Sequence, residues 1–507
     1  MQKLYPDFRK SLDVAFDHAV SHLEHLDSAS VAATLDADAL RTRINKPLAN
    51  EGTPPPQVVE ELVRDVEGGL LGSAGGRFFG WVIGGALPAA VAADWLTSAW
   101  QQNAALYACS PGAAVVEETV GTWLKDILGL PQSASFALVT GCQMAHVTCL
   151  AAARHALLAK RGWDVESQGL YGAPPIRILS SSERHGSFER AVRLLGFGQA
   201  HIRLLPVDDR CRLLPEALED ELSKNPDAPT LVLLQAGDIN IGAYDSFETL
   251  IPIAKRYNAW VHVDGAFGLW AAASPRLRYL VKGIEAADSW ATDGHKWLNV
   301  PFDSGFAFVA DAESHRASLS MRASYLTHAA DARDQMDWNP EWSRRARAFP
   351  AYAALRQLGR NGVTDLIERC CRRATAIVKG IGELPGAEVV WMPVINQGLV
   401  RFLDSKAGAT DEGHDQSTAT EEAHDCRTAS NGDHDRVTAT EKNHDRRTDE
   451  VIAAILKTGE AFFGGTTWRG RRAMRVSVCN WQTSEEDVQR VVKAVADAMR
   501  AVSQRIA

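Results

Sequence analysis

The sequence predicts an α/β protein built on a mostly parallel β-sheet. From residue 136 onward, short apolar runs typical of buried strands alternate with segments that carry apolar residues at helical spacing. The strands are expected at Phe136 to Thr140, Ile176 to Leu179, Thr230 to Leu234 and Trp260 to Val263. The helices between them are expected at Met144 to Lys160, Phe188 to Leu195 and Phe247 to Tyr257. Such an alternation covers both faces of a sheet with helices, and ligands then bind at the carboxyl ends of the strands.

Helices precede this unit, and a smaller α+β unit follows it. The first helices are expected at Phe8 to Leu26 and, after three consecutive prolines, at Val58 to Leu71. The last unit has strand candidates at Glu388 to Trp391, Gly398 to Phe402 and Ala473 to Val478, and helix candidates at Glu450 to Phe462 and Ser484 to Ser503. The predicted division is an N-terminal helical segment at 1–95, a large domain at 96–375 and a small C-terminal domain at 376–507.

Residues 409–448 are four copies of a ten-residue unit: ATDEGHDQST, ATEEAHDCRT, ASNGDHDRVT and ATEKNHDRRT. The unit has almost no apolar residue to bury, so a disordered or loosely ordered surface loop is expected, with Thr448 as the N-cap of the next helix. Each copy contains one histidine: His414, His424, His434 and His444. Imidazoles ten residues apart on a polar loop are not brought together by local structure, so no metal is expected there. Duplication of the sequence before a helix accounts for the repeat.

Composition argues against several classes of function. The formal net charge of −9 gives no broad basic surface, so nucleic acid is not an expected partner. The apolar stretch from Trp81 to Trp100 is broken by glycine, proline and aspartate, so no membrane span is expected. The N-terminus does not resemble a signal peptide, and none of the eight cysteines forms a Cys-x-x-Cys pair. Reduced thiols in a cytoplasm are therefore expected.

Asp264 and Lys296 are the most informative residues of the chain. Asp264 ends the apolar run Trp-Val-His-Val, where a carboxylate needs a cationic or hydrogen-bonding partner. Lys296 follows about thirty residues later in a Gly-His turn. A lysine amine forms a Schiff base with an aldehyde cofactor, and a carboxylate can keep a pyridine nitrogen protonated. This pair is what an enzyme using pyridoxal 5'-phosphate (PLP) needs.

Three further loops follow predicted strands. Gly141, Cys142 and Gln143 join a strand to a long helix, so their backbone N–H groups are suited to a phosphate, although a plain turn is the alternative. His185 could face a flat cofactor ring or could be structural. Asn240, in the loop at 237–245, could contact cofactor or substrate, or could belong to a bare turn.

These residues resemble the PLP-dependent group II amino-acid decarboxylases, the family that contains the aromatic-amino-acid, histidine and glutamate decarboxylases. The matching motifs are His-Val-Asp264-Gly-Ala266-Phe-Gly, Asp288-Ser289 and Asp-Gly-His295-Lys296-Trp-Leu-Asn-Val-Pro. The similarity runs from Arg77 to Arg475, and so spans most of the chain. The segment His185-Gly-Ser-Phe-Glu-Arg-Ala is especially similar to the aromatic and histidine branch.

The resemblance implies fold type I, a homodimer with active sites at the subunit interface, and PLP-dependent decarboxylation of an L-amino acid. It implies that Lys296 forms the Schiff base and that Asp264 contacts the pyridine nitrogen. It places Ala266 on one face of the ring and His185 on the other. It also implies that the phosphate is held by Gly141, Cys142, Gln143 and His295.

Two positions depart from the family pattern. Asp293 stands where the aromatic branch has an amide, and a carboxylate beside a phosphate is repelled unless it turns away or is protonated. Gln335 aligns with the proton-donating tyrosine of a mobile loop, and an amide is no effective general acid at neutral pH. Tyr325 is close enough in sequence to substitute for it.

These departures leave alternative functions open. Without a tyrosine, the carbanion left by CO2 loss could react with oxygen to give an aldehyde, and the same fold could also support carbon–carbon cleavage. A non-catalytic binding protein is a third alternative, but the presence of both Lys296 and Asp264 argues against it.

The substrate is only weakly indicated. The segment that lines the side-chain pocket in the family is here Phe79, Trp81, Val82 and Ile83, which favours an apolar or aromatic amino acid unless these residues are ordinary core. Arg475 could recognise a carboxylate, or could be one more solvated charge among neighbouring arginines.

Overall fold

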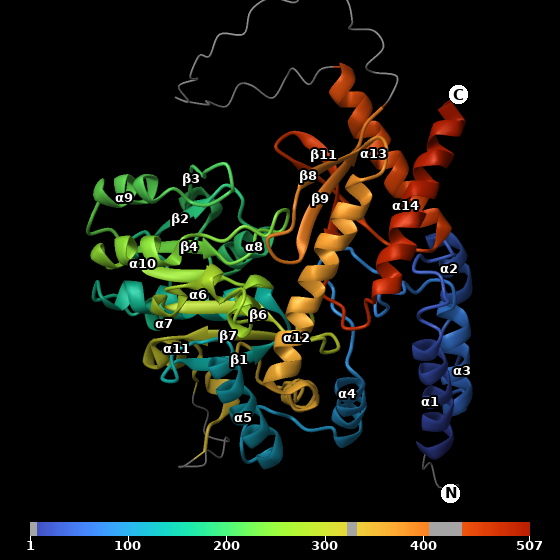
Figure 1. The fold of residues 1–507 in the computed structure, drawn as a ribbon. Helices are drawn as coiled ribbons and strands as arrows, with labels where there is room; N and C mark the ends of the chain where they lie inside the picture. Colours follow the sequence, from blue (N-terminus) through green and yellow to red (C-terminus); the bar gives the residue numbers. More distant parts are fainter. Residues whose placement is uncertain (1–7, 322–331, 405–438, 507) are drawn as a thin grey trace, which may run out of the picture.

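A large sheet of seven strands forms the centre of the molecule in the computed structural model, which describes residues 8–321, 332–404 and 439–506 (Figure 1). Its strands are β1 (Ser135–Val139), β2 (Arg177–Ser181), β3 (Ile202–Leu205), β4 (Thr230–Gln235), β5 (Trp260–Asp264), β6 (Ser289–Asp293) and β7 (Gly305–Val309). The order is β1-β7-β6-β5-β4-β2-β3, and β7 is antiparallel to both of its neighbours while the other pairs are parallel. The predicted, mostly parallel α/β sheet is confirmed.

Helices cover both faces of this sheet, which explains why central strands such as β4 and β5 are buried along their whole length. In β4, Val232 and Leu234 belong to one core cluster, while Leu231 and Leu233 belong to the cluster on the other face. The helices of this unit are α5 (Pro111–Ile127), α6 (Cys142–Ala159), α7 (Val165–Gln168), α8 (Gly186–Leu194), α9 (Pro215–Ser223), α10 (Phe247–Arg256) and α11 (Ala312–Leu319). Helix α6 lies against β6 and β7 and so begins close to the carboxyl end of β6.

A second, antiparallel sheet has the order β10-β11-β9-β8. Its strands are β8 (Ala387–Trp391), β9 (Gln397–Phe402), β10 (Gly464–Trp468) and β11 (Arg471–Ser477). The helices α13 (Ala439–Thr458) and α14 (Glu485–Ile506) pack against each other beside it. Helix α12 (Ala348–Gly382), which bends at Gly359, runs from the large sheet to this small one (Figure 1). The predicted boundaries at 95/96 and 375/376 fall inside α4 (Pro88–Trp100) and α12, so neither is an open linker.

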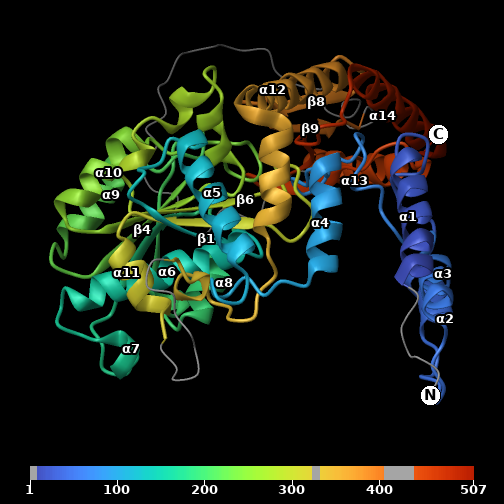
Figure 2. The same ribbon diagram turned by 90° about the horizontal axis from the view of Figure 1, so that it is seen from below.

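The N-terminal helices α1 (Phe8–Glu24), α2 (Ala37–Ile44) and α3 (Pro55–Val66) stand side by side at one end of the molecule, away from the large sheet (Figures 1 and 2). Helices α1 and α3 match the two that the sequence predicts, with α3 starting in the run of prolines, whereas α2 was not predicted. None of the helices in the described ranges is both long and apolar enough to span a membrane.

The last copy of the repeat is part of a helix, so the loop predicted at 409–448 is wrong for residues 439–448. These residues form the first half of α13, and Thr448 is buried inside the helix instead of capping it. The Thr448 hydroxyl donates to the carbonyl of His444 and accepts the backbone N–H of Phe402. The imidazole of His444 accepts the N–H of Asp404. The three earlier copies, with His414, His424 and His434, lie outside the described residues.

A buried arginine explains why this polar segment folds. Arg401 on β9 is 1% exposed and pairs with Glu441 at 2.8 Å and Asp445 at 3.3 Å, both from the last copy. A buried guanidinium needs such partners, and residues four apart present their side chains on one face of a helix. The start of α13 is therefore stabilised by Arg401, a tertiary partner that the local sequence pattern does not indicate.

Candidate active site

The carboxyl ends of five strands meet around a cavity of about 420 Å³. Residues that follow β1, β2, β4, β5 and β6 line it, together with one residue from the N-terminal segment and one from β11. The volume lies in the range of small-molecule sites, and the position is the one expected of a parallel sheet. Ten residues predicted to form the site line this cavity: Trp81, Gly141, Cys142, Gln143, His185, Asp264, Ala266, His295, Lys296 and Arg475.

The amine of Lys296 is held by a carboxylate. Its Nζ lies 2.9 Å from Oδ2 of Asp293, which is almost completely buried. The other oxygen of Asp293, Oδ1, accepts the backbone N–H of Cys142 at 2.6 Å. Burial acts to lower the pKa of Lys296, but the carboxylate of Asp293, together with the more distant Asp264, outweighs it and raises that pKa above its ordinary value. Asp293 is thus turned toward both the lysine and the start of α6.

Asp264 ends β5 as a buried, ionised carboxylate. Its Oδ1 accepts the backbone N–H of Ala266 at 3.1 Å, and its Oδ2 lies 3.5 Å from Nε2 of His146. Burial alone would raise the pKa of Asp264, but the neighbouring His146, then His185 and the Ala266 amide, hold it well below its ordinary value. The site therefore offers a permanent negative charge on the cavity wall.

The two histidines of the cavity have defined hydrogen-bonding roles. His185 caps α8, with Nδ1 accepting the N–H of Ser187 at 3.2 Å and lying 2.8 Å from its hydroxyl, so the ring hydrogen sits on Nε2. Nδ1 of His295 lies 2.8 Å from the carbonyl oxygen of Ser304 and must be a donor. Burial lowers the pKa of His295, although Asp293 acts in the opposite direction. A bound anion would favour the charged ring, which donates from Nε2 as well.

Arg475 brings a cation to the cavity from the small domain. It lies on β11, it is 9% exposed, and its Nε has no hydrogen-bond partner among the described residues. Burial lowers the pKa of Arg475, and the nearby Asp238 partly offsets this. A buried guanidinium with spare donors is suited to a carboxylate ligand.

The N-terminal segment fixes the turn that contains the lysine. The N–H of Gly84 donates to the carbonyl of His295 at 3.1 Å. A Cβ at Gly84 would lie 2.0 Å from the carbonyl oxygen of Lys296, so only glycine allows this approach.

Asn299 then ties three parts of the chain together. Its Oδ1 accepts the N–H groups of Gly85 and Trp481, and its Nδ2 donates to the carbonyl of Cys479. Asn299 is completely buried. The small domain and the N-terminal segment therefore both hold the turn in which Lys296 sits.

The structure does not bring three predicted residues to the cavity. The amide oxygen of Asn240 accepts the hydroxyl of Thr466 at 2.8 Å, so this side chain serves the contact with the small domain instead. Ile83 is half-buried and is not among the lining residues. Gln335 is buried against Arg333, which donates to its side-chain oxygen. Tyr325 lies outside the described residues.

Other residues of the site were not predicted. Gln235, Ile239 and Phe267 line the cavity, and His146 supports Asp264 from behind. His146 stands four residues after Cys142 on a predicted helix, so its position on the same face was available from the sequence. No sequence signal marks Asn299, whose partners come from both ends of the chain.

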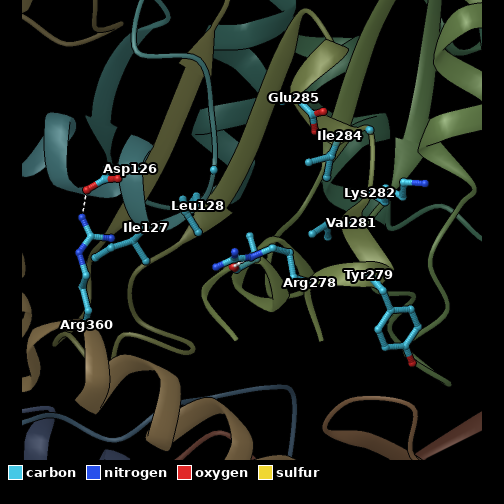
Figure 3. A pocket seen from close by; sticks show the side chains of 13 residues that line it. Asp126, Ile127, Leu128, Arg278, Tyr279, Val281, Lys282, Ile284, Glu285 and Arg360 are labelled. Carbon is cyan, nitrogen blue, oxygen red and sulfur yellow. Dashed lines mark hydrogen bonds and ion pairs between the residues drawn. The ribbon is translucent and has the colours of Figure 1, made fainter. Parts of the chain in front are cut away.

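A larger cavity of about 610 Å³ lies near α5 and α12 (Figure 3). Its charged groups are mostly satisfied within the protein: Arg360 pairs with Asp126, and Lys282 pairs with Glu248 at 2.7 Å. Nε of Arg278 donates to the carbonyl of Ala272. Among the described residues that line this cavity, no nucleophile has an activating partner, in contrast to the site at Lys296.

The residues present fit PLP. A lysine amine, an ionised carboxylate and the N-terminus of a long helix face one cavity. Nε2 of Gln143 is buried there with no partner in the described part of the chain, as expected of a donor awaiting a ligand. Fold and site together define the class as a PLP-dependent enzyme.

Comparison with known proteins identifies the family. The family described as the pyridoxal-dependent decarboxylase conserved domain matches residues 38–403. The aromatic-L-amino-acid decarboxylase of Bacillus atrophaeus is 28% identical over 404 residues, which are 78% of this chain and 82% of that protein. A phenylacetaldehyde synthase of a Rosa hybrid cultivar is 26% identical over 366 residues, or 70% of this chain and 71% of that protein.

A solved structure agrees with this fold. The structure of TDC from Oryza sativa with PLP and tryptamine has a TM-score of 0.86, 24% sequence identity and a match over 99% of each chain. Because the family match covers more than half of the chain, the protein belongs to the PLP-dependent amino-acid decarboxylases, which are carboxy-lyases. The predicted family, fold type I and PLP are confirmed.

Proposed function

We propose that this enzyme decarboxylates an L-amino acid with an apolar or aromatic side chain, using PLP bound to Lys296. The observation that carries this proposal is the convergence of Lys296, Asp264 and the start of α6 on one cavity. PLP supplies an electron-accepting ring that weakens a bond to the α-carbon of an amino acid attached to it. The cavity wall also includes Trp81, Ile239 and Phe267, which favours an apolar side chain.

The chain's own residues then have separate tasks. Asp264 would keep a negative charge beside the ring nitrogen, and Ala266 and His185 would contact the ring. Gly141, Cys142, Gln143 and His295 would hold the phosphate. Arg475 would offer its unpaired Nε to a substrate carboxylate.

Lys296 can carry a proton in this site. Its amine lies 2.9 Å from the side-chain oxygen Oδ2 of Asp293, and the pKa of Lys296 is raised. A protonated amine beside the reacting centre can return a proton to the α-carbon when CO2 has left. This would complete the reaction without a residue from the loop that contains Gln335.

An aldehyde-forming reaction is the second candidate. No tyrosine is among the described residues that line the cavity, and Gln335 lies away from it. One relative is named as a phenylacetaldehyde synthase. A carbanion that is protonated slowly remains available to oxygen, so oxidative decarboxylation is the expected competitor.

A panel of amino acids assayed for CO2, amine, aldehyde and peroxide tests both candidates. We expect CO2 and one equivalent of amine from an aromatic or apolar amino acid. Aldehyde and peroxide in place of amine would favour the second candidate. An absence of CO2 from every amino acid in the panel would contradict both.

We also propose that the enzyme is a homodimer, with the N-terminal helices packed on a second copy. On α1, Phe8, Leu12 and Phe16 are 72%, 54% and 54% exposed and recur every four residues, so they form one apolar stripe. On α3, Leu62 is 61% exposed. Apolar surface of this extent is typical of an interface.

A cytoplasmic location is proposed as well. The cysteines of the described ranges are all free thiols, which suits a reducing compartment. Cell fractionation followed by immunoblotting tests this proposal, and recovery of the protein outside the cytoplasm would contradict it.

A further inference from the structure

A chain of buried polar groups runs from Asp264 into the core behind the cavity. Oδ2 of Asp264 lies 3.5 Å from Nε2 of His146, and Nδ1 of His146 lies 2.9 Å from Nε2 of His262. Nδ1 of His262 lies 2.9 Å from the hydroxyl of Ser289, which accepts Nε1–H of Trp260 at 2.9 Å. The two imidazoles and Ser289 are completely buried.

The two ends of this chain determine its direction. The indole N–H of Trp260 can only donate, so the Ser289 oxygen accepts from it and its own hydrogen is available to His262. Asp264, at the other end, is ionised and can only accept. With one hydrogen on each ring, both imidazoles then donate from Nε2 toward Asp264. If the hydrogen bonds ran in the opposite direction, Nε2 of His146 would face the Asp264 carboxylate without a hydrogen.

Burial keeps the imidazole of His262, in the middle of this row of polar groups, neutral. It lowers the pKa of His262 to about 3, with His146 acting in the same direction and Asp264 against it. Every hydrogen-bonding nitrogen of His146 and His262 has a partner in this chain. Such a fully connected buried network holds its members in one arrangement.

Cys142 lies beside the same carboxylate. Together, Cys142, His146 and Asp264 resemble the ligands of a metal site. The thiol sulfur, Nε2 of His146 and a carboxylate oxygen of Asp264 lie within 4.8 Å of one another. However, burial, followed by Asp264 and Asp293, raises the pKa of Cys142 well above its ordinary value. The group is therefore a thiol. Its sulfur lies 3.5 Å from Nε2 of His146, and its S–H donates to Oδ1 of Asp264 at 3.9 Å.

We propose that His146, backed by His262 and Ser289, is a positioning residue that fixes the carboxylate of Asp264 for the PLP ring nitrogen. Nε2 of His146 lies 3.5 Å from Oδ2 of Asp264, and the Ala266 N–H donates to Oδ1, so both oxygens of this carboxylate are held. A carboxylate held in this way does not have to be ordered when the cofactor binds, so more of its charge is available to the ring. This inference rests on the proposed contact between Asp264 and that nitrogen.

Three variants of His146 and Asp264 test the proposal through the affinity of the apo-protein for PLP, measured by fluorescence titration. His146→Leu removes the donor to Asp264, and we expect PLP to bind about tenfold more weakly, as for the loss of one hydrogen bond to a charged group. His146→Gln restores an N–H near the position of Nε2, and we expect affinity within about threefold of the wild type. Asp264→Asn should weaken binding at least as much as His146→Leu.

His155→Leu is the matched control. His155 stands on the same helix and also pairs with a carboxylate, Glu166, at 2.7 Å, but it does not line the cavity. Its replacement should leave PLP affinity unchanged. Unchanged PLP affinity in His146→Leu together with weaker binding in Asp264→Asn would overturn the positioning role of His146. Unchanged affinity in both would instead overturn the role of Asp264 in the proposed function.

A measurement on the wild-type apo-protein keeps the test decisive if His146→Leu does not fold. Nitrogen-15 NMR of the histidine rings distinguishes the neutral tautomers from the charged form. We expect Nε2 of His146 and Nε2 of His262 to carry hydrogen. An Nε2 of His146 without hydrogen, or stoichiometric zinc in the purified apo-protein, would overturn the proposal.

Discussion

The carboxylate of Asp293 joins the Lys296 amine, at 2.9 Å, to the backbone N–H of Cys142, at 2.6 Å. It therefore contacts both the residue proposed to attack the PLP aldehyde and the helix terminus that is suited to its phosphate. A carboxylate and a phosphate at one helix terminus repel each other. Asp293 must accordingly give up the Cys142 N–H when the phosphate binds there.

Replacing Asp293 with asparagine should make the apo-protein take up PLP faster. Asp293 raises the pKa of Lys296, and only the neutral amine attacks an aldehyde, so the uptake rate rises as the pH rises through that pKa. Asp293→Asn removes the negative charge that raises the pKa of Lys296. We therefore expect PLP uptake about three- to tenfold faster at pH 7, and a pH profile of the uptake rate that is moved toward lower pH. Stopped-flow absorbance over a range of pH measures this. A profile that stays in place, or moves toward higher pH, would show that Asp293 does not control the amine.

Arg475 should act on substrate binding more than on the chemical step. Loss of a guanidinium–carboxylate contact costs about 1.5–3 kcal/mol, so Arg475→Gln is expected to raise KM by about 10- to 100-fold with a smaller change in kcat. Arg471→Gln, on the same strand but half exposed, is the control and should leave both constants unchanged. A fall in kcat alone would argue against the carboxylate contact.

The four copies of the repeat should differ in their importance for stability. Glu441→Gln with Asp445→Asn leaves the buried Arg401 without its carboxylates, so we expect about 2–3 kcal/mol lower free energy of unfolding by urea denaturation. The same exchange in the second copy, Glu421→Gln with Asp425→Asn, should have no effect. Deletion of residues 409–438, which spares the last copy, should preserve activity. Equal destabilisation by the two double variants would contradict the special role of the last copy.

The apolar stripe of the N-terminal helices should hold the dimer together. Leu12→Glu with Leu62→Glu places two charges on that surface, and we expect the dimer to dissociate at a concentration at least tenfold higher than for the wild type. Sedimentation velocity measures this. Leu194→Glu on α8, where the leucine is 65% exposed, is the matched control. A wild-type protein that sediments as a monomer would contradict the homodimer.

Local sequence was sufficient for much of the fold, because most of the predicted strands of the large sheet are short apolar runs. It failed where tertiary partners decide the structure. Strand β6 reads Ser-Trp-Ala-Thr-Asp and β7 reads Gly-Phe-Ala-Phe-Val, and neither was predicted, although both are completely buried. The start of α13 was predicted as loop, because Arg401 lies forty residues before its partner Glu441.

The site followed a similar pattern. Residues at strand ends converge by topology, so Asp264, His185 and Lys296 could be placed on one cavity from their spacing. Asn240 also follows a strand, but its side chain turns to Thr466 in the small domain, a partner that no local pattern reveals.

We infer that Lys296 is the lysine that binds PLP, and the roles proposed for the other site residues depend on it. Borohydride reduction of the PLP-loaded enzyme fixes the cofactor to its lysine, and peptide mass spectrometry then locates the modified residue. We expect one pyridoxyl group per chain, on Lys296, and none on the Lys296→Ala variant. A pyridoxyl group on another lysine of the wild-type enzyme, or none at all, would contradict the account.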